Sequence, residues 1–165
     1  MATTYTPIAT TTLGSPAASV TFSSISGTYT DLILVLNCSL TSGTGNAAIQ
    51  FNSDTGNNYS FTSLGGSGTA AVSSRNTGAS STYLSYYGYL TQTWQNYVTQ
   101  IMNYSNSTTY TTLLSRANNT DNGTNANVGL WRNTSAVTSV TVIAALSSST
   151  FIAGSTFTLY GVKSA

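Results

Sequence analysis

The stretch TFTLYGV, Thr156 to Val162, alternates between two kinds of side chain. In an extended chain, Phe157, Leu159 and Gly161 fall on one face, and the residues between them fall on the other. A period of two residues is typical of a β-strand with one buried face. The stretch SVTVIAAL, residues 139–146, repeats the pattern. Both stretches therefore predict strands that pack one face against a core.

Strand signals of this kind run through the chain, whereas helix signals are nearly absent. There is no glutamate, there is a single lysine, and apolar residues do not recur at the spacing of a helix face. Short β-branched and aromatic runs are separated instead by Gly, Asn, Ser and Asp, which favours strands joined by turns. The predicted strands are 20–25, 31–38, 47–51, 59–64, 82–90, 95–104, 109–117, 126–131, 137–146 and 155–163.

About ten short strands with turn-rich links predict an all-β fold, an antiparallel two-sheet sandwich of the jelly-roll type. The run LILVL, Leu32 to Leu36, does not alternate, and this predicts a central strand that is covered on both sides. The segment GSGTAAVSSRNTGASS, residues 66–81, is interpreted as a long loop. The length of 165 residues predicts one domain over residues 1–165, with residues 1–18 as an extended amino-terminal arm.

Charged side chains make up only 4% of the chain, which has a net charge of +1 and no histidine. Ser, Thr and Asn take the place of charge, so the surface is expected to consist of hydroxyls and amides with little mutual repulsion. Such a surface suits a protein that packs against copies of itself or against a neutral partner. Nucleic acid is not expected as a partner, because the cations Arg75, Arg116, Arg132 and Lys163 are scattered. No membrane association is expected, because no apolar run approaches about 20 residues.

The first residues, MATTYTPIATTT, lack the basic region and long apolar stretch of a signal peptide. The lone Cys38 cannot form an internal disulfide, which favours folding in a reducing cytosol. We interpret Cys38 as a small buried core residue.

The acidic residues Asp31, Asp54 and Asp121 are the candidates for a metal site or a catalytic pair. In NSDTGNN, Asp54 is placed to bind nearby backbone amides in a turn, with Gly56 free to take a positive φ. A calcium loop is the alternative, but calcium requires six to eight oxygens, and tight sites hold two or more carboxylates. We predict turns at Asp54 and at Asp121, and a bond from Asp31 to backbone at the start of its strand. No metal or cofactor is expected.

This composition offers few of the groups that catalysis requires. Without histidine, the chain has no ordinary Ser-His or Cys-His pair, and its separated aspartates do not form a carboxylate dyad. A Ser-Lys pair would have to use Lys163 near the carboxyl end. The sequence therefore predicts that the protein is not an enzyme.

The segment TYLSYYGYLTQTW, Thr82 to Trp94, is the most aromatic part of the chain. As a strand, it would carry tyrosines on both faces, of which one should line the core and the other should point outward. Tyrosine is enriched at protein interfaces, so these rings form the candidate interface. The candidate interface residues are Tyr83, Tyr86, Tyr87, Tyr89 and Trp94. Two alternatives stay open: the rings pack within a core or loop, with Trp94 and Trp131 as core anchors, or they stack on sugars.

Three segments, GTYTDLILVL (27–36), IQFNSDTGNNYS (49–60) and FIAGSTFTLYGVK (151–163), together resemble small β-sandwich virion proteins of tailed bacteriophages. The resemblance implies a head-decorating (cement) protein or a fibre component, often a trimeric jelly roll, and implies no catalytic or ligand residues. The expected function is therefore a structural virion protein at the capsid surface. Its expected partners are the major capsid protein and copies of itself as a homotrimer. The alternative is a fibre or tail-tip domain that binds a receptor or glycan.

Overall fold

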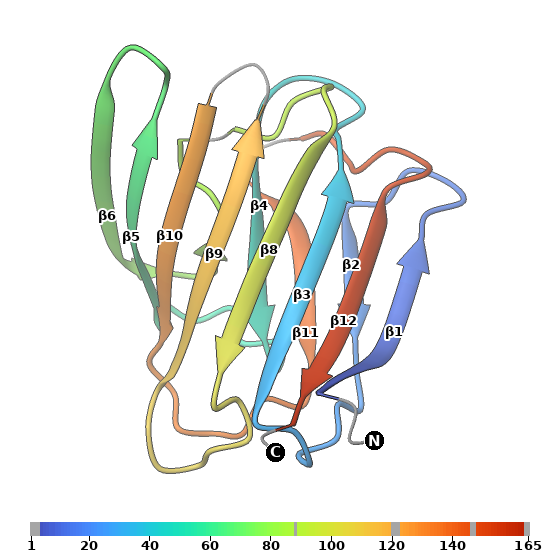
Figure 1. Cartoon of the computed structure of the whole chain (residues 1–165), viewed down its shortest axis with the longest axis vertical. Coiled ribbons are helices and arrows are strands. Elements are labelled where there is room, and N and C mark those ends of the chain that lie inside the picture. Colours follow the sequence, from blue (N-terminus) through green and yellow to red (C-terminus); the bar gives the residue numbers. More distant parts are fainter. Residues whose placement is uncertain (1–3, 88, 120–122, 146–147, 164–165) are drawn as a thin grey trace.

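The computed structural model describes residues 4–87, 89–119, 123–145 and 148–163, and the elements within them are β-strands in two antiparallel sheets (Figure 1). The large sheet has eight strands and the small sheet has four. In chain order the strands are β1 (Tyr5–Thr12), β2 (Ser19–Phe22), β3 (Asp31–Cys38), β4 (Asn46–Phe51), β5 (Tyr59–Gly66), β6 (Ala71–Ala79), β7 (Thr82–Tyr83), β8 (Gln95–Met102), β9 (Thr111–Asn119), β10 (Gly123–Trp131), β11 (Val140–Ala145) and β12 (Thr156–Val162). The predicted all-β, two-sheet fold class is confirmed.

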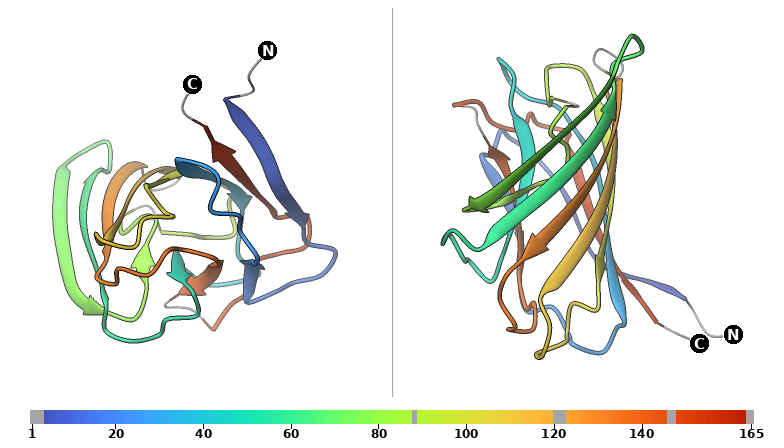
Figure 2. Two further views of the ribbon diagram at one scale, coloured as in Figure 1. Left: turned by 90° about the horizontal axis from the view of Figure 1, so that it is seen from below. Right: turned by 90° about the vertical axis from the view of Figure 1, so that its left-hand side faces the viewer.

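The order of the strands is that of a jelly roll with additions. The large sheet runs β1-β12-β3-β8-β9-β10-β5-β6, and the small sheet runs β2-β11-β4-β7. If β1, β8, β9 and β12 are set aside, β2-β11-β4-β7 faces β3-β10-β5-β6, which is the strand order of an eight-stranded jelly roll. The β8–β9 pair is inserted between β3 and β10, while β12 and β1 extend the sheet beyond β3. Figure 2 shows β1 and the end of β12 splaying away from the body.

The core lies between the two sheets and follows the predicted alternation. In β12 the buried side chains are Phe157 and Leu159, and in β3 they include Leu34 and Leu36, which lie opposite them in register. The rings of Phe151 and Phe157 meet edge to face at 5.1 Å between centroids. Strands whose apolar residues alternate therefore place these residues on the inner face of the large sheet, where the small sheet covers them.

The predicted cover on both sides of the run at Leu32 to Leu36 is wrong for the isolated chain. β3 is a central strand, between β12 and β8, but its burial alternates. Leu32, Leu34 and Leu36 are buried, whereas Ile33 and Val35 are only half-buried on the outer face of the large sheet. The sequence is apolar on both faces, and the fold covers one of them.

Two strands lie where the sequence predicts none. The predicted loop at residues 66–81 is wrong, because residues 71–79 form β6 at one edge of the large sheet, paired only with β5. Residues 5–12 of the expected arm form β1 at the opposite edge, paired with β12. An edge strand has a single neighbour and little buried surface, so its sequence can be polar (as in VSSRNT of β6) and still be a strand.

A row of polar side chains crosses the inner face of the large sheet. Thr99, Ser115, Asn127 and Ser63 are cross-strand neighbours on β8, β9, β10 and β5, and all four are fully buried. The Thr99 hydroxyl donates to Ser115 Oγ at 2.9 Å, and the Asn127 amide donates to the backbone carbonyl of Tyr83. The row satisfies most of its polar atoms, and Asn127 Oδ1 is left without a hydrogen-bond partner among the described residues.

Candidate functional site

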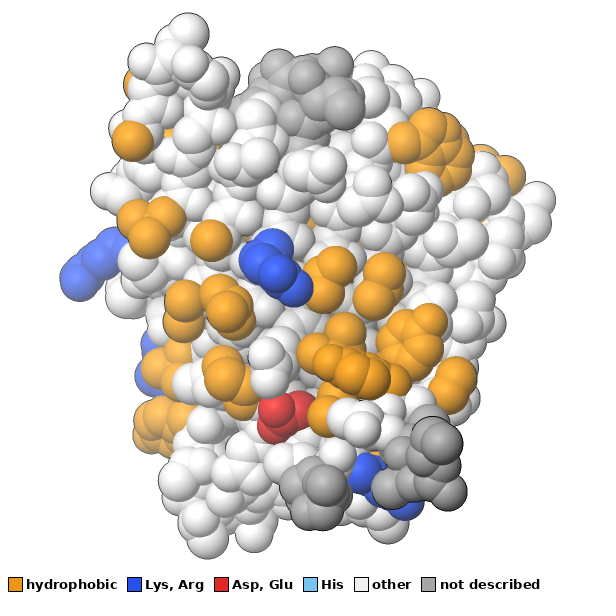
Figure 3. Space-filling view, in the orientation of Figure 1, with side chains coloured by type: hydrophobic (Ala, Val, Ile, Leu, Met, Phe, Trp, Pro, Cys, Tyr) orange, Lys and Arg blue, Asp and Glu red, His pale blue; other side chains and the backbone are white. Residues whose placement is uncertain are grey.

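The outer face of the large sheet, on the side away from the small sheet, gathers exposed apolar side chains (Figure 3). Seven large apolar residues of the described chain are exposed, and four of them lie on this face: Tyr5, Leu64, Leu114 and Val128. Their exposed fractions run from 39% for Leu114 to 61% for Leu64. Large apolar side chains that are scattered singly are normal, but a group on one face marks an interaction surface.

We call this surface the outer face. At its centre, Val35 and Val98 are cross-strand partners on β3 and β8, and Leu114 lies on the adjacent strand β9, diagonal to Val98. Towards its edges, polar side chains bond to each other: Asn37 donates to Asn96 at 2.7 Å, and a threonine pair joins β1 to β12 at 3.2 Å. An apolar centre with a satisfied polar rim is the usual anatomy of a protein interface.

Three hollows open on the outer face. One, with a volume of about 680 Å³, lies over β5, β10, β9 and β8, and its lining includes Leu64, Ala126 and Arg116. A second, of about 520 Å³, is lined by Tyr5, Ile33, Val98, Gln100, Leu114 and Arg116. A third, of about 340 Å³, lies towards β6 and includes Arg75 and Val128. Arg116 therefore stands between the two larger hollows and lines both.

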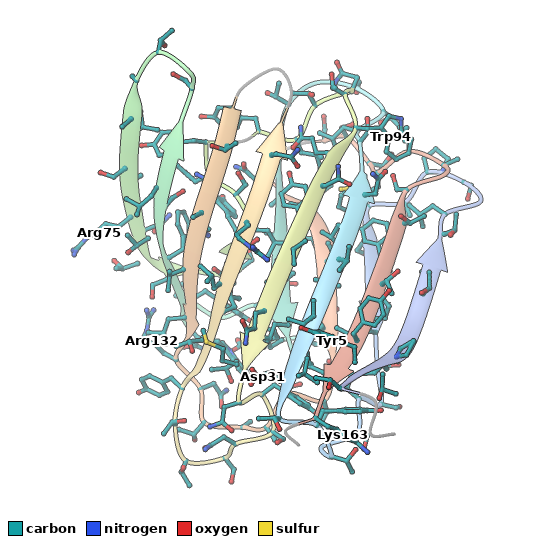
Figure 4. The ribbon with its side chains drawn as sticks, in the orientation of Figure 1. Tyr5, Asp31, Arg75, Trp94, Arg132 and Lys163 are labelled. Atoms are coloured by element: carbon teal, nitrogen blue, oxygen red, sulfur yellow. The ribbon has the colours of Figure 1, made fainter. Side chains whose placement is uncertain are left out.

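The outer face carries few charged side chains, and only some of them have a hydrogen-bond partner. Asp31 at the start of β3 accepts two hydrogen bonds at 2.8 Å, one from the backbone N–H of Asn103 and one from the side chain of Gln100. The predicted bond from Asp31 to backbone is thus confirmed. The Arg116 side chain is exposed and has no hydrogen-bond or ion-pair partner within the described part of the chain. Arg75 projects at the β6 edge (Figure 4).

The aromatic segment at residues 82–94 does not form the predicted long strand. Among the described residues of this segment, Thr82 and Tyr83 form a strand, β7. Beyond it, Leu84 N–H still donates to the Ala47 carbonyl of β4, and Leu90 forms an isolated bridge with Gly45. Leu84 and Ser85 are both buried and Tyr86 and Tyr87 are both half-buried, so burial does not alternate along this segment. The bulk of the rings and the small residues between them suit a loop that packs on the sandwich.

Three of the five candidate interface residues pack within the molecule. Tyr83 and Tyr86 stack at 6.1 Å, and both contact the ring of Phe61, at 5.0 and 5.4 Å between centroids. Tyr87 meets Tyr86 edge to face at 5.1 Å and donates its hydroxyl to the Ser73 carbonyl on β6. These rings are half-buried and hold the segment against β5 and β6. They correspond to the alternative in which the rings pack internally.

Tyr89 and Trp94 are the two candidate residues that point to solvent. Their exposed fractions are 43% and 44%, and Figure 4 shows Trp94 at one end of the sandwich, beyond the strands of the large sheet. The Gln95 side chain holds the loop by donating to the Tyr89 carbonyl at 2.6 Å. The prediction that Trp94 is a core anchor is therefore wrong, whereas Trp131 is only 1% exposed and is a core anchor.

The predicted turn at Asp54 is confirmed, with a different backbone from the one expected. The Asp54 N–H donates to the Phe51 carbonyl, and Asn52 and Ser53 take positive φ values of 51° and 57°. Gly56 is not among the residues with positive φ. Asn52 tolerates the left-handed region better than most residues, because its short side chain can bond locally.

Three donors surround the Asp54 carboxylate. The Gly56 N–H donates at 2.8 Å, the Asn58 side chain at 2.9 Å, and the Trp131 indole N–H at 2.7 Å. Burial raises the pKa of Asp54, but the hydrogen bonds from Trp131, Asn58 and Gly56 together lower it below its ordinary value. The carboxylate thus ties the turn to the core.

The remaining candidates for reactive or metal-binding groups are Cys38 and Asp121. Cys38 is fully buried, and burial raises the pKa of its thiol, which keeps it protonated and unreactive. Asp121 lies outside the described residues. Within those residues no three His, Cys, Asp or Glu side chains group as a metal site would require. The described chain also contains no helix with the length and apolar character needed to cross a membrane.

The sequence analysis identified the outer apolar residues of β3 through the run at Leu32 to Leu36, but it missed the other residues of the outer face. A signal was present, because TTLLSRA places two leucines in succession at Leu113 and Leu114, and LILVL places five apolar residues in succession. In a strand, adjacent apolar residues point to opposite faces, so each pair predicts apolar side chains on both faces of the sheet.

Fold and surface together define a two-sheet β-sandwich with an apolar, sparsely charged outer face and an exposed aromatic loop. Comparison of the chain with models of protein families, with curated proteins and with solved structures finds no match.

Proposed function

We propose that the chain is a structural virion protein that decorates and stabilises the capsid of a tailed phage by binding between capsid subunits. The main support is a surface suited to contact without charge: the exposed rings of Tyr89 and Trp94, and an outer face with an apolar centre, a bonded polar rim and few charges. The three sequence segments that resemble small phage virion proteins supply the phage context. We take the capsid as the partner because a cementing protein adds neutral contact surface, and a symmetric shell repeats that contact many times.

The mechanism is mechanical. Stable interfaces bury about 800 Å² on each partner, and many modest contacts repeated over a shell become strong through multivalency. The exposed rings of Tyr89 and Trp94 provide the contact with the capsid, since aromatic anchors contribute much of the binding energy at interfaces. Tyr83 and Tyr86, which contact Phe61, and Tyr87, which contacts Tyr86, position this loop on the sandwich.

Binding without turnover also agrees with how the reactive groups are held. The Cys38 thiol is buried, and the carboxylates of Asp31 and Asp54 are each bound by donors from the protein itself. These groups stabilise local structure, and none of them lines the three hollows on the outer face.

Electron microscopy of virions from the phage that encodes the chain tests this proposal. We expect density for the sandwich on the head surface, with the Tyr89–Trp94 loop against capsid subunits. Trp94→Ser should weaken attachment to emptied heads at least about tenfold, as expected for an interfacial tryptophan contributing more than about 1.4 kcal/mol. The control is Tyr110→Ser, which removes an exposed ring (52%) outside the loop. Density at the tail tip, or equal attachment of both variants, would contradict the proposal.

A receptor- or glycan-binding fibre domain is the second candidate, and one observation favours it. Tyr89 and Trp94 are exposed in the same loop, and exposed aromatic rings are the usual platforms for sugars. Binding of host polysaccharide would change the fluorescence of Trp94 and would leave that of the buried Trp131 unchanged. A saturable change of this kind, absent in Trp94→Ser, would favour the fibre role over decoration.

A further inference from the structure

The sequence of β3 predicts a packed layer on the outer face, and the described part of the chain supplies none. β3 sits in the middle of the large sheet and is apolar on both faces, but only the inner face is covered. Strands with apolar residues on both faces occur where both faces are packed. Ile33 and Val35, together with Val98 on β8 and the exposed Leu114 on β9, form the apolar centre of this face, with Gln100 and Arg116 beside them. No other layer of the described chain covers this centre.

The size of the outer face fits a stable protein interface. Eight strands spaced about 4.8 Å apart, each about eight residues long at about 3.3 Å per residue, cover roughly 1,000 Å². A standard stable interface buries about 800 Å² on each partner. The outer face is therefore large enough to form such an interface by itself, with the bonded pairs Asn37–Asn96 and Thr10–Thr158 in its rim.

The charges on the outer face are complementary to each other. Arg116 is a cation without a partner in the described chain, set between two hollows with apolar linings. Asp31 is an anion on the same face whose two oxygens each accept one hydrogen bond and can each accept another. In a two-fold interface residue i meets residue j and residue j meets residue i, so Arg116 and Asp31 can pair twice, while the other cation, Arg75, lies towards the β6 edge.

We propose that two copies of this chain pair through their outer faces about a two-fold axis, with Arg116 of each copy opposite Asp31 of the other. The two large sheets then pack face to face at about 10 Å, as the sheets of a sandwich do. The inference rests on the proposed function, because a decorating protein acts in several copies. It proposes a two-fold pair through the outer face in place of the homotrimer that the resemblance implies. The net charge of +1 presents no barrier to the pairing.

Sedimentation equilibrium of the purified full chain tests the pairing. We expect a dimer, and we expect Leu114→Asn and Arg116→Glu each to weaken it at least about tenfold, which corresponds to about 1.4 kcal/mol. Both side chains point outward, so neither change opens a cavity in the core. Tyr110→Ser is the matched control for loss of an exposed apolar group and should leave the dimer unchanged. Equal thermal unfolding of the variants checks that each is folded.

The charge pair has its own test. Exchange of the two charges in one chain, Asp31→Arg with Arg116→Asp, should restore dimerisation relative to Arg116→Glu, because opposite charges again face each other. A monomer at all concentrations would overturn the inference, as would a trimer or a dimer that neither Leu114→Asn nor Arg116→Glu weakens. A dimer that fails to attach to emptied heads would count against the capsid role and leave the pairing intact, so the two failures can be told apart.

Discussion

Replacing Trp131 with alanine is expected to lower the free energy of unfolding by about 3–5 kcal/mol, the usual cost of truncating a large buried aromatic residue. Trp131 is 1% exposed and lies at the end of β10. Its ring contacts Phe51 at 5.5 Å and stacks on Tyr59 at 6.4 Å, and its indole N–H donates to Asp54. Truncation therefore opens a cavity between the sheets and removes a donor from the carboxylate. Urea unfolding followed by circular dichroism measures the loss.

The contribution from Asp54 gives this variant a dependence on pH. The folded-state pKa of Asp54 is lowered, so its stabilisation is present above the unfolded value of about 3.9 and is lost as the pH falls through the folded pKa. The loss caused by Trp131→Ala should therefore be smaller in acid than at neutral pH. In an Asp54→Asn background the difference between the two pH values should disappear. A loss that is the same at both pH values would show that the hydrogen bond contributes nothing.

Adding a methyl group at Gly161 is expected to cost about 1–3 kcal/mol, because it overpacks a tight contact. A Cβ at this position would lie 2.4 Å from atoms of the Tyr29 ring, far inside van der Waals contact. The backbone of Gly161 has no positive φ, so the cost of Gly161→Ala comes from this contact alone. Thermal or urea unfolding of the variant measures the cost.

Two further variants separate this contact from a general effect of alanine. Gly14→Ala places a methyl group where no atom lies within 4 Å, and it should be close to neutral. Tyr29→Ser removes the ring, and in that background Gly161→Ala should lose most of its cost. Additive costs in the double variant would mean that the Tyr29 ring is not what excludes the side chain.

The sequence predicts the interior of this fold well, because burial on one face imposes a period of two. The bounds of β3 agree with prediction at both ends, and those of β12 agree to within one residue. Edge strands escape this reasoning: β6 contains Ser, Arg, Asn and Thr, since it pairs with one neighbour and buries little. Polar residues on the inner face escape it as well, because Ser115 and Asn127 are buried through hydrogen bonding to neighbours that only the register brings together.

The candidate site was predictable only in part. An aromatic run such as residues 82–94 signals contact, but sequence cannot say which rings the loop turns inward against Phe61 and which, like Tyr89 and Trp94, it leaves outside. The outer face depends on which strands become neighbours. Val98 and Leu114 become parts of one surface only through the pairing of β3, β8 and β9.

The most direct test of the account is the effect of salt on the attachment of the protein to phage heads. The proposed contacts with the capsid are made by the exposed rings of Tyr89 and Trp94, and only 4% of the residues in the chain are charged. Molar sodium chloride screens charges beyond about 3 Å and leaves burial of apolar surface intact or stronger. We predict that the protein stays on the heads when they are washed in molar salt. Release of the protein as the salt concentration rises would contradict the claim that broad, uncharged contact holds it in place.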